Sequence, residues 1–176
     1  MYKRQIPKYP RCWAHDCEDV KDLIQAWKDG HNLVINNFDS GFTDKQELLK
    51  ALEKQFEGRM AFHIYAGYKG CSSFRVHEDT ANNFIMQIEG ETHWKVYNER
   101  CSTLIKHGSF IFGGDESHLG EPLMDVVLTP GDMIYIPSRS YHCAHPSKNA
   151  RLSMSIPLWH GLDMPQSDRK EYHIKV

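Results

Sequence analysis

The sequence lacks the features that define several protein classes. Its apolar runs fall well short of the ~18 residues that a membrane-spanning helix needs, and the N-terminal stretch MYKRQIPKYPRCW has no apolar segment of the kind found in secretory signals. The 21 Lys and Arg residues are scattered and are balanced by 23 Asp and Glu residues. Nucleic-acid binding needs a clustered basic surplus, so we expect neither a nucleic acid nor a membrane among the partners.

Cysteine is too irregularly placed for a disulfide framework or a zinc ribbon. The five cysteines are odd in number and include no C-x-x-C pair. Free thiols in a reducing compartment are the expected state, which makes the cytoplasm the expected location. The five are Cys12, Cys17, Cys71, Cys101 and Cys143.

Two helical segments precede a series of short strands. Residues 1–17 are polar and are expected as extended chain or as an edge strand. Residues 19–28 place apolar side chains at helical spacing, and residues 43–46 resemble a capping box at the start of a second helix that ends at Gly58. The expected strands, separated by turns, are 33–38, 60–66, 74–79, 83–89, 92–97, 124–128, 133–136, 141–145 and 151–156.

This order of elements predicts a mainly β fold. Short strands after a brief helical part are typical of a small antiparallel barrel or jelly roll with helices packed outside. The chain has no linker, internal repeat or low-complexity segment, and 176 residues suffice for one domain with a real core. We therefore expect a single domain over residues 1–176. The mouth of such a barrel is a natural concave site.

His77 and Asp79 are the first candidate metal ligands. On an extended strand alternate side chains share a face, so these two point the same way and Glu78 points opposite. They offer a divalent ion two ligands and require a third from elsewhere. Two histidines and one carboxylate on one face form the ligand set of non-haem Fe(II) oxygenases. An isolated H-x-D tripeptide is a weak signal, since most such tripeptides lie in surface loops.

A second motif gives the first one its context. A turn at Gly131 leads into the apolar strand MIYI, and Pro137 breaks that strand before a loop that delivers His142. Together the two motifs resemble the JmjC/cupin-fold 2-oxoglutarate-dependent oxygenases, a group that includes the asparaginyl hydroxylase of hypoxia factors and the ribosomal-protein hydroxylases. The resemblance covers roughly residues 33–159. The matching residues are His77-x-Asp79, Asn83-Phe84, Gln87-Ile88-Glu89-Gly90, Trp94, Pro130-Gly131-Asp132, Tyr135-Ile136-Pro137 and His142.

The resemblance implies a fold, a cofactor set and a reaction. The fold would be a double-stranded β-helix, the jelly-roll barrel of the cupins, with Fe(II) held by His77, Asp79 and His142. The reaction would couple oxidative decarboxylation of 2-oxoglutarate to hydroxylation of a C–H bond in a peptide or amino-acid side chain. Asn83 and Ser155 match positions that contact the cosubstrate in some members of the family.

One position departs from the family pattern. Many relatives carry a Lys or Arg fifteen residues after the first metal histidine, where it pairs with the far carboxylate of 2-oxoglutarate; here that position is Thr92. A hydroxyl cannot neutralise a buried carboxylate, and an unpaired buried charge is costly. Arg151, which shares a strand face with Ser155, is the first candidate to supply the cation. Arg75 is the second and could instead meet the substrate, whereas Lys95 has the wrong parity if Thr92 points inward.

Alternatives to the oxygenase hypothesis follow from the same residues. A metal-dependent cupin enzyme that does not use 2-oxoglutarate, such as an isomerase or another dioxygenase, would account for Thr92. A non-catalytic cupin-fold binding protein would keep the fold but would have no need of an open metal face. A small metabolite is an alternative to a peptide or protein substrate, and the sequence leaves the oligomeric state open. Cys143 should face away from the metal, whereas His145 could crowd it.

Overall fold

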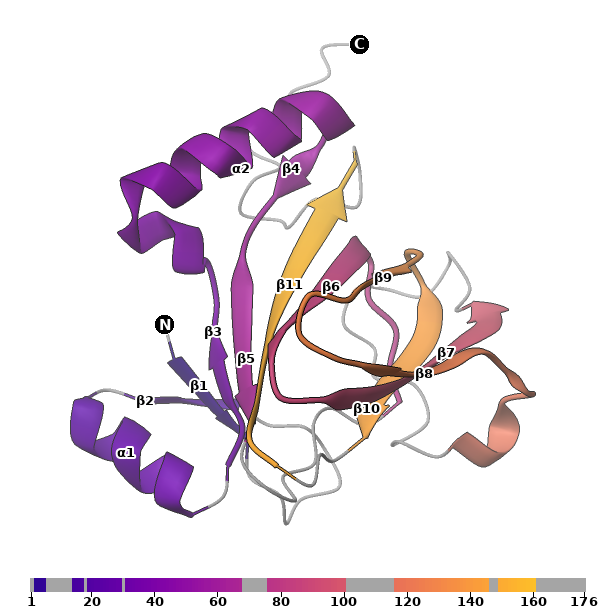
Figure 1. Ribbon diagram of the computed structural model, residues 1–176, viewed down its shortest axis with the longest axis horizontal. Helices are drawn as coiled ribbons and strands as arrows, with labels where there is room; N and C mark the ends of the chain where they lie inside the picture. The colour runs from indigo at the N-terminus through magenta and orange to yellow at the C-terminus, as the bar shows by residue number, and fades with distance from the viewer. Residues whose placement is uncertain are drawn as a thin grey trace, which may run out of the picture.

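The described part of the chain builds one sheet of eight strands and one of three. Figure 1 shows the small sheet beside the large one, with both helices on the side opposite the small sheet. The computed structural model describes residues 2–5, 14–17, 19–29, 31–67, 76–100, 116–145 and 149–160.

The first elements lie at one edge of the large sheet. Strands β1 (Tyr2–Gln5) and β2 (Ala14–Cys17) pair with each other and end the strand order at that side, which confirms the expected edge position. Helix α1 (Val20–Lys28) follows, as its apolar spacing predicts. The Asp19 side chain caps it by accepting a hydrogen bond from the backbone N–H of Asp22 at 2.9 Å.

Helix α2 (Thr43–Phe56) is confirmed in place, but the capping box is wrong. Thr43 is already the first helical residue, so Phe42 occupies the N-cap and no side chain supplies a capping hydrogen bond. At the other end Glu57 adopts the left-handed conformation, with φ of 52°. Gly58 follows it and brings the chain back toward the large sheet.

Helix α2 covers one face of the large sheet through a small apolar cluster. Leu49 is buried and Leu52 half-buried, and both belong to this cluster. A Cβ on Gly58 would lie 2.6 Å from Leu158 Cδ1 and 2.8 Å from the Trp159 carbonyl oxygen, so glycine permits the close return of the chain. The buried residues that complete the cluster are Met60, Phe62, Ile156 and Leu158.

The large sheet is antiparallel throughout, in the order β2-β1-β3-β5-β11-β6-β9, with β4 paired to β11. The expected strand 60–66 is divided into two, and the expected strand 33–38 ends early because a short 3-10 helix begins at Phe38. The remaining elements on this side are β3 (Leu33–Ile35), η1 (Phe38–Gly41), β4 (Arg59–Met60), β5 (His63–Gly67), β6 (Asn82–Glu89), β9 (Met133–Ile136) and β11 (Arg151–Trp159).

The small sheet has the order β10-β7-β8 and packs on the large sheet through an apolar core. Its strands are β7 (Thr92–Arg100), β8 (Pro122–Leu128) and β10 (Ser140–His145), and a 3-10 helix, η2 (Glu116–His118), precedes β8. Side chains from both sheets alternate into the core. Its buried members are Ile85, Trp94, Val96, Leu128, Ile134, Ile136 and Ala144.

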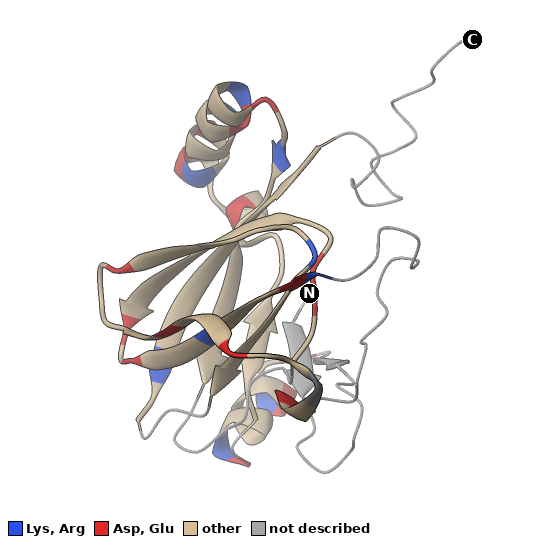
Figure 2. Ribbon diagram, turned by 90° about the vertical axis from the view of Figure 1, so that its right-hand side faces the viewer, with Lys and Arg blue, Asp and Glu red and all other residues tan. Residues whose placement is uncertain are grey.

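These two facing antiparallel sheets confirm the mainly β, cupin-type prediction, with one difference. Among the described strands no ladder joins the two sheets, so the barrel is open and the apolar core holds its halves together. Figure 2 shows basic and acidic residues mixed along α2. Neither described helix combines the length and apolar character that crossing a membrane would require.

Candidate metal centre

His77 and His142 are brought together by backbone pairing. They form an isolated antiparallel bridge in which the His77 N–H donates to the His142 carbonyl at 3.1 Å and the His142 N–H donates to the His77 carbonyl at 2.9 Å. Residues directly opposite each other in such a pair project their side chains to the same face. The two imidazole centroids are accordingly 4.3 Å apart.

Asp79 completes a group of three potential ligands. Its Oδ2 lies 3.5 Å from His142 Nε2, and one donor atom from each of the three residues lies within 4.8 Å of the others. Of the expected strand 74–79 the structure describes residues 76–79, in which His77 forms only a bridge and Asp79 lies beyond it. The Arg139 N–H donates to the Asp79 carbonyl at 2.7 Å and fixes this turn of the backbone.

The charge state of Asp79 suits a metal ligand. Burial opposes ionisation, but the hydrogen bond with His142 and the nearby His77 together hold the pKa of Asp79 well below its usual range. The carboxylate is therefore ionised at neutral pH. Its side chain is 41% exposed while that of His142 is 3% exposed, so one side of the group stays open to an incoming ligand.

His142 is held in the tautomer that a metal requires. Its Nδ1 lies 2.9 Å from the Ser140 carbonyl oxygen, so Nδ1 carries a proton, and Nε2, which bonds to Asp79 through its own proton in the metal-free chain, becomes the lone-pair donor when a metal replaces that proton. Burial disfavours the charged imidazole, yet the contact with Asp79 raises the pKa of His142 on balance. Two imidazoles and a carboxylate on one accessible face fit the donor set of a non-haem Fe(II) centre.

Asn83 and Ser155 form a second layer behind Asp79. Asn83 Nδ2 donates to Asp79 Oδ2 at 3.4 Å, and Ser155 Oγ donates to Asn83 Oδ1 at 2.7 Å. Both residues are buried, at 6% and 2% exposed. Their hydrogen bonds orient the carboxylate, and the contact with the cosubstrate that the sequence suggests for these two residues stays a prediction.

Arg151 meets Thr92 in the interior. Its Nη1 donates to Thr92 Oγ1 at 3.2 Å, and both side chains are buried, at 7% and 1% exposed. Ser153, two residues along β11, donates to Gln87 at 2.8 Å from the same strand face. A Cβ on Gly67 would lie 2.9 Å from Arg151 Nε, so the glycine leaves the guanidinium its space. The structure thus places the cation named from sequence beside the position that departs from the family pattern.

The other sequence candidates lie elsewhere. Arg75 falls outside the described residues. Lys95 is on the outer face of β7, where its Nζ lies 3.2 Å from Glu116, as its parity predicts. The expectation that His145 crowds the metal is wrong, because the side chain faces away and its Nε2 lies 3.6 Å from Glu116.

Two residues of β5, His63 and Tyr65, lie at the site although the sequence alone did not identify them. His63 is paired with Ser155 and Tyr65 with Ser153, so both share the inward face of β11. Burial raises the pKa of Tyr65, with a further contribution from Asp79, and burial lowers the pKa of His63. The alternation in MAFHIYA puts these two side chains on one face, but only the pairing with β11 reveals that it is the inner one.

Comparison with known proteins is consistent across sequence and structure. The JmjC domain family matches residues 36–164. Ribosomal oxygenase 1 of Danio rerio is 34% identical over 100 residues, which are 54% of this chain and 18% of that protein. The bifunctional lysine-specific demethylase and histidyl-hydroxylase NO66 of Drosophila persimilis is 28% identical over 155 residues, covering 88% of this chain and 20% of that protein.

Solved structures show the same fold. The ribosomal oxygenase YcfD of Escherichia coli, in complex with cobalt and 2-oxoglutarate, superposes with a TM-score of 0.63 at 18% identity over 91% of this chain and 40% of that chain. Another YcfD structure, in complex with cobalt and succinic acid, superposes with the same TM-score at 17% identity. This chain spans about a fifth of the length of the curated relatives it matches.

Proposed function

Because the chain belongs to the JmjC domain family, we propose that it is an Fe(II)- and 2-oxoglutarate-dependent hydroxylase of protein side chains. The observation that carries this proposal is the bridge between His77 and His142, which puts both imidazoles and the Asp79 carboxylate within mutual ligand distance. A structural polar cluster would need neither the buried, tautomer-fixed His142 nor an open side on the carboxylate.

His77, Asp79 and His142 would hold the metal. When bound, Fe(II) and 2-oxoglutarate would supply oxidative decarboxylation coupled to insertion of oxygen into a C–H bond, chemistry that belongs to the cofactors rather than to the protein. Asp79 contributes a negative charge that the hydrogen bond from Asn83 orients, and Ser155 in turn fixes Asn83. Such support from behind the ligands maintains their direction and basicity.

Arg151 would bind the far carboxylate of 2-oxoglutarate. A guanidinium matches a carboxylate with two parallel hydrogen bonds, and burial strengthens each of them. Thr92 positions the guanidinium by accepting one N–H. Arg151, Ser153 and Ser155 lie at alternate positions of β11, so a continuous polar row runs from the carboxylate anchor toward Asp79. This row favours a 2-oxoglutarate-dependent reaction over a cupin reaction that does not use 2-oxoglutarate, because Arg151 would supply the positive charge that many relatives carry at the position of Thr92.

The substrate class is proposed from the relatives. Those named above are called ribosomal oxygenase and histidyl-hydroxylase, so a protein side chain is the proposed target and a small metabolite is the alternative. A single domain over residues 1–176, a cytoplasmic location, and the absence of nucleic-acid and membrane partners stay predictions.

Anaerobic titration tests the proposal. Addition of Fe(II) and then 2-oxoglutarate should produce the weak visible charge-transfer band of the metal–cosubstrate chelate. His142→Ala should abolish the band, whereas His160→Ala, at an exposed histidine, should retain it. Fe(II) binding without the band would favour a cupin enzyme that does not use 2-oxoglutarate, and no Fe(II) binding would favour a non-catalytic protein.

Turnover tests the reaction itself. In air, the protein should convert 2-oxoglutarate to succinate, and addition of peptides from ribosomal proteins should accelerate this conversion. Mass spectrometry of the peptides should show the gain of one oxygen atom on a side chain. Succinate formation that no peptide accelerates would contradict the proposed substrate class while leaving the cofactor assignment in place.

A further inference from the structure

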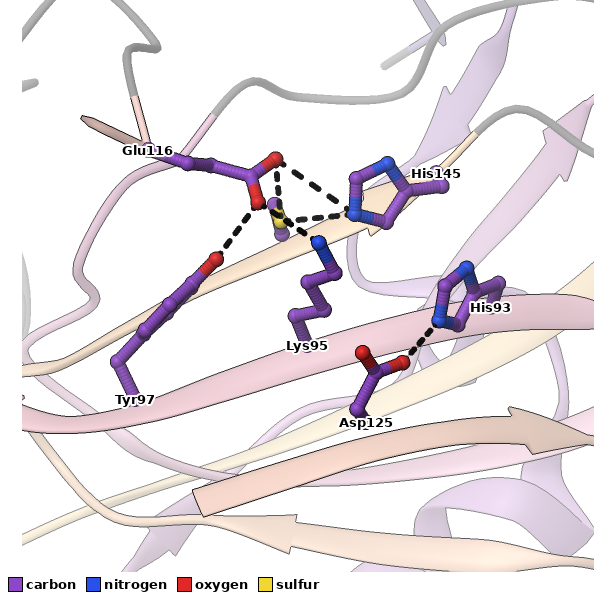
Figure 3. A network of polar contacts seen from close by, with 7 residues as sticks. His93, Lys95, Tyr97, Glu116, Asp125 and His145 are labelled. Atoms are coloured by element: carbon purple, nitrogen blue, oxygen red, sulfur yellow. Dashed lines mark hydrogen bonds and ion pairs between the residues drawn. The ribbon is translucent and has the colours of Figure 1, made fainter. Parts of the chain in front are cut away.

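The outer face of the small sheet carries a second cluster of metal-binding residue types. Glu116 of η2 and Cys143 and His145 of β10 each offer one donor atom, and these atoms lie within 4.8 Å of one another. Figure 3 shows Glu116 and His145 facing each other in this cluster. We propose that these three residues form a second metal site, selective for Zn²⁺, that is separate from the His77, Asp79 and His142 centre. This inference does not depend on the proposed oxygenase activity.

Strand alternation separates the two sites. Cys143 follows His142 directly on β10, so its side chain faces the opposite side of the sheet. It is 4% exposed and packs with Val76, Tyr97 and Tyr141. One strand therefore contributes a ligand to the inner site and, from the next residue, a ligand to the outer one.

The donor atoms form a triangle of the size that zinc requires. Cys143 Sγ lies 3.5 Å from His145 Nε2 and 3.6 Å from Glu116 Oε1, and the last two atoms are 3.6 Å apart. Tetrahedral coordination with Zn–S of ~2.3 Å and Zn–N and Zn–O of ~2.0–2.1 Å gives edges of about 3.6 Å to sulfur and about 3.4 Å between nitrogen and oxygen. The three donors already stand at nearly these separations.

The arrangement does not suit a cysteine nucleophile. In a hydrolytic triad the acid binds one imidazole nitrogen and the nucleophile faces the other. Here the thiol and the carboxylate both approach Nε2 of His145. Donors that converge on one point, rather than forming a relay, are what a metal ion needs.

The two carboxylate oxygens of Glu116 contact different groups. Its Oε2 accepts hydrogen bonds from the Tyr97 hydroxyl at 2.6 Å and the Lys95 ammonium at 3.2 Å, while Oε1 faces the thiol and the imidazole. Outer contacts of this kind hold a ligand in position. The arrangement thus presents Oε1 to the metal and keeps the positive charge of Lys95 on the far oxygen.

The charges of the site balance and its fourth position is accessible. A thiolate and a carboxylate together neutralise one divalent ion, the charge of Lys95 beside Glu116 is offset by the nearby Asp125, and the proton of Cys143 leaves to solvent on binding. His145 is 29% exposed and Glu116 32% exposed, so water can complete the tetrahedron. The His93 ring, which contacts Asp125, stacks on His145 with centroids 4.9 Å apart and limits its rotation.

Cobalt substitution distinguishes the two sites by spectroscopy. Co²⁺ bound to a thiolate gives an intense near-ultraviolet charge-transfer band, and none of the described residues of the inner site is a sulfur donor. Titration of the full chain with Co²⁺ should therefore produce this band, and excess Zn²⁺ should remove it. The band should survive in His142→Ala, which disrupts only the inner site, and should be absent in Cys143→Ser.

A second variant, Glu116→Gln, keeps the Cys143 thiol and serves as a control for misfolding of Cys143→Ser. Glu116→Gln should weaken Co²⁺ binding, followed by the same band, by at least about 10-fold, with an unchanged far-ultraviolet circular dichroism spectrum. Absence of the band in the wild-type chain, persistence of the full band in Cys143→Ser, or unchanged affinity in Glu116→Gln would each overturn the site.

Discussion

Removal of the Arg151 guanidinium should weaken 2-oxoglutarate binding by two to three orders of magnitude. A hydrogen bond to a charged group contributes about 1.5–3 kcal/mol, and a paired guanidinium–carboxylate contact makes two of them. Allowing for partial replacement by water, Arg151→Ala should lose about 3–4 kcal/mol. At about 1.4 kcal/mol per factor of ten, the dissociation constant should rise on the order of 100- to 1,000-fold.

Thermal stabilisation by the cosubstrate measures this change without turnover. Under anaerobic conditions with Fe(II), 2-oxoglutarate at 100 times the wild-type dissociation constant should stabilise the wild type by about 2.7 kcal/mol. For a chain of this size that corresponds to a rise in Tm of roughly 5–10 °C. If affinity falls 100-fold, the same concentration stabilises Arg151→Ala by only about 0.4 kcal/mol, a rise of roughly 1–2 °C.

Two further variants separate charge from geometry. Arg151→Lys keeps the charge but not the planar fork, so its Tm shift should lie between those of the wild type and Arg151→Ala. Arg75→Ala should keep most of the shift. A full shift in Arg151→Ala, or an equal loss in Arg75→Ala, would refute the assignment of Arg151 as the carboxylate anchor.

Other predictions concern the supports of the site and of the fold. Gly67→Ala would place a methyl group 2.9 Å from the guanidinium and should raise the dissociation constant for 2-oxoglutarate at least several-fold, measured by the same thermal shift. Leu49→Ala, at a buried contact of α2, should lower the free energy of unfolding in urea by about 2–4 kcal/mol, against under about 0.5 kcal/mol for exposed Leu48→Ala. Asp132→Asn tests a turn in which hydrogen bonds from the Thr129 backbone N–H and hydroxyl lower the pKa of Asp132 below its usual range. A carboxylate whose pKa is lower in the folded than in the unfolded state stabilises the fold at pH values above its unfolded-state pKa. This stabilisation is lost as the pH falls through the folded-state pKa. The wild type should therefore exceed Asp132→Asn in Tm at pH 7 but not in strong acid.

Each of these predictions has an outcome that contradicts it. Gly41→Ala, where a Cβ would meet nothing within 4 Å, is the control for Gly67, and equal effects would remove the steric argument. Equal destabilisation by both leucine variants would mean that α2 is not docked as described. A Tm difference for Asp132→Asn that persists unchanged into strong acid would exclude the charged hydrogen bond as its cause.

The local pattern of the chain determined most of the elements. Helical spacing placed α1 and α2, and alternation placed β6 and β7 on either side of the turn at Gly90, whose φ of 67° favours glycine. The capping box failed because a four-residue pattern is compatible with more than one register of the helix start. Among the described strands the two sheets are not joined by a ladder, which the sequence did not indicate because alternation says nothing about which sheet edges pair.

The candidate metal ligands were likewise visible in the sequence, but the contacts that bring them together were not. Spacing alone put His77 and Asp79 near each other, and family resemblance suggested His142 as the third ligand. Arg151 was the first candidate for the cation because it shares a strand face with Ser155, and the pairing of β11 with its neighbours sets it beside Thr92. His63 and Tyr65 were overlooked because the inner face of β5 is defined only by its partner strand.

The sequence by itself determined which residues share a face of each strand and which chemistry those faces can carry. Only the tertiary structure decided which face is interior, which strands lie side by side, and that Cys143, His145 and Glu116 converge outside while His142 turns inward. The physical reason is that alternation is a local property of the backbone. Register and burial instead depend on contacts between residues distant in the chain.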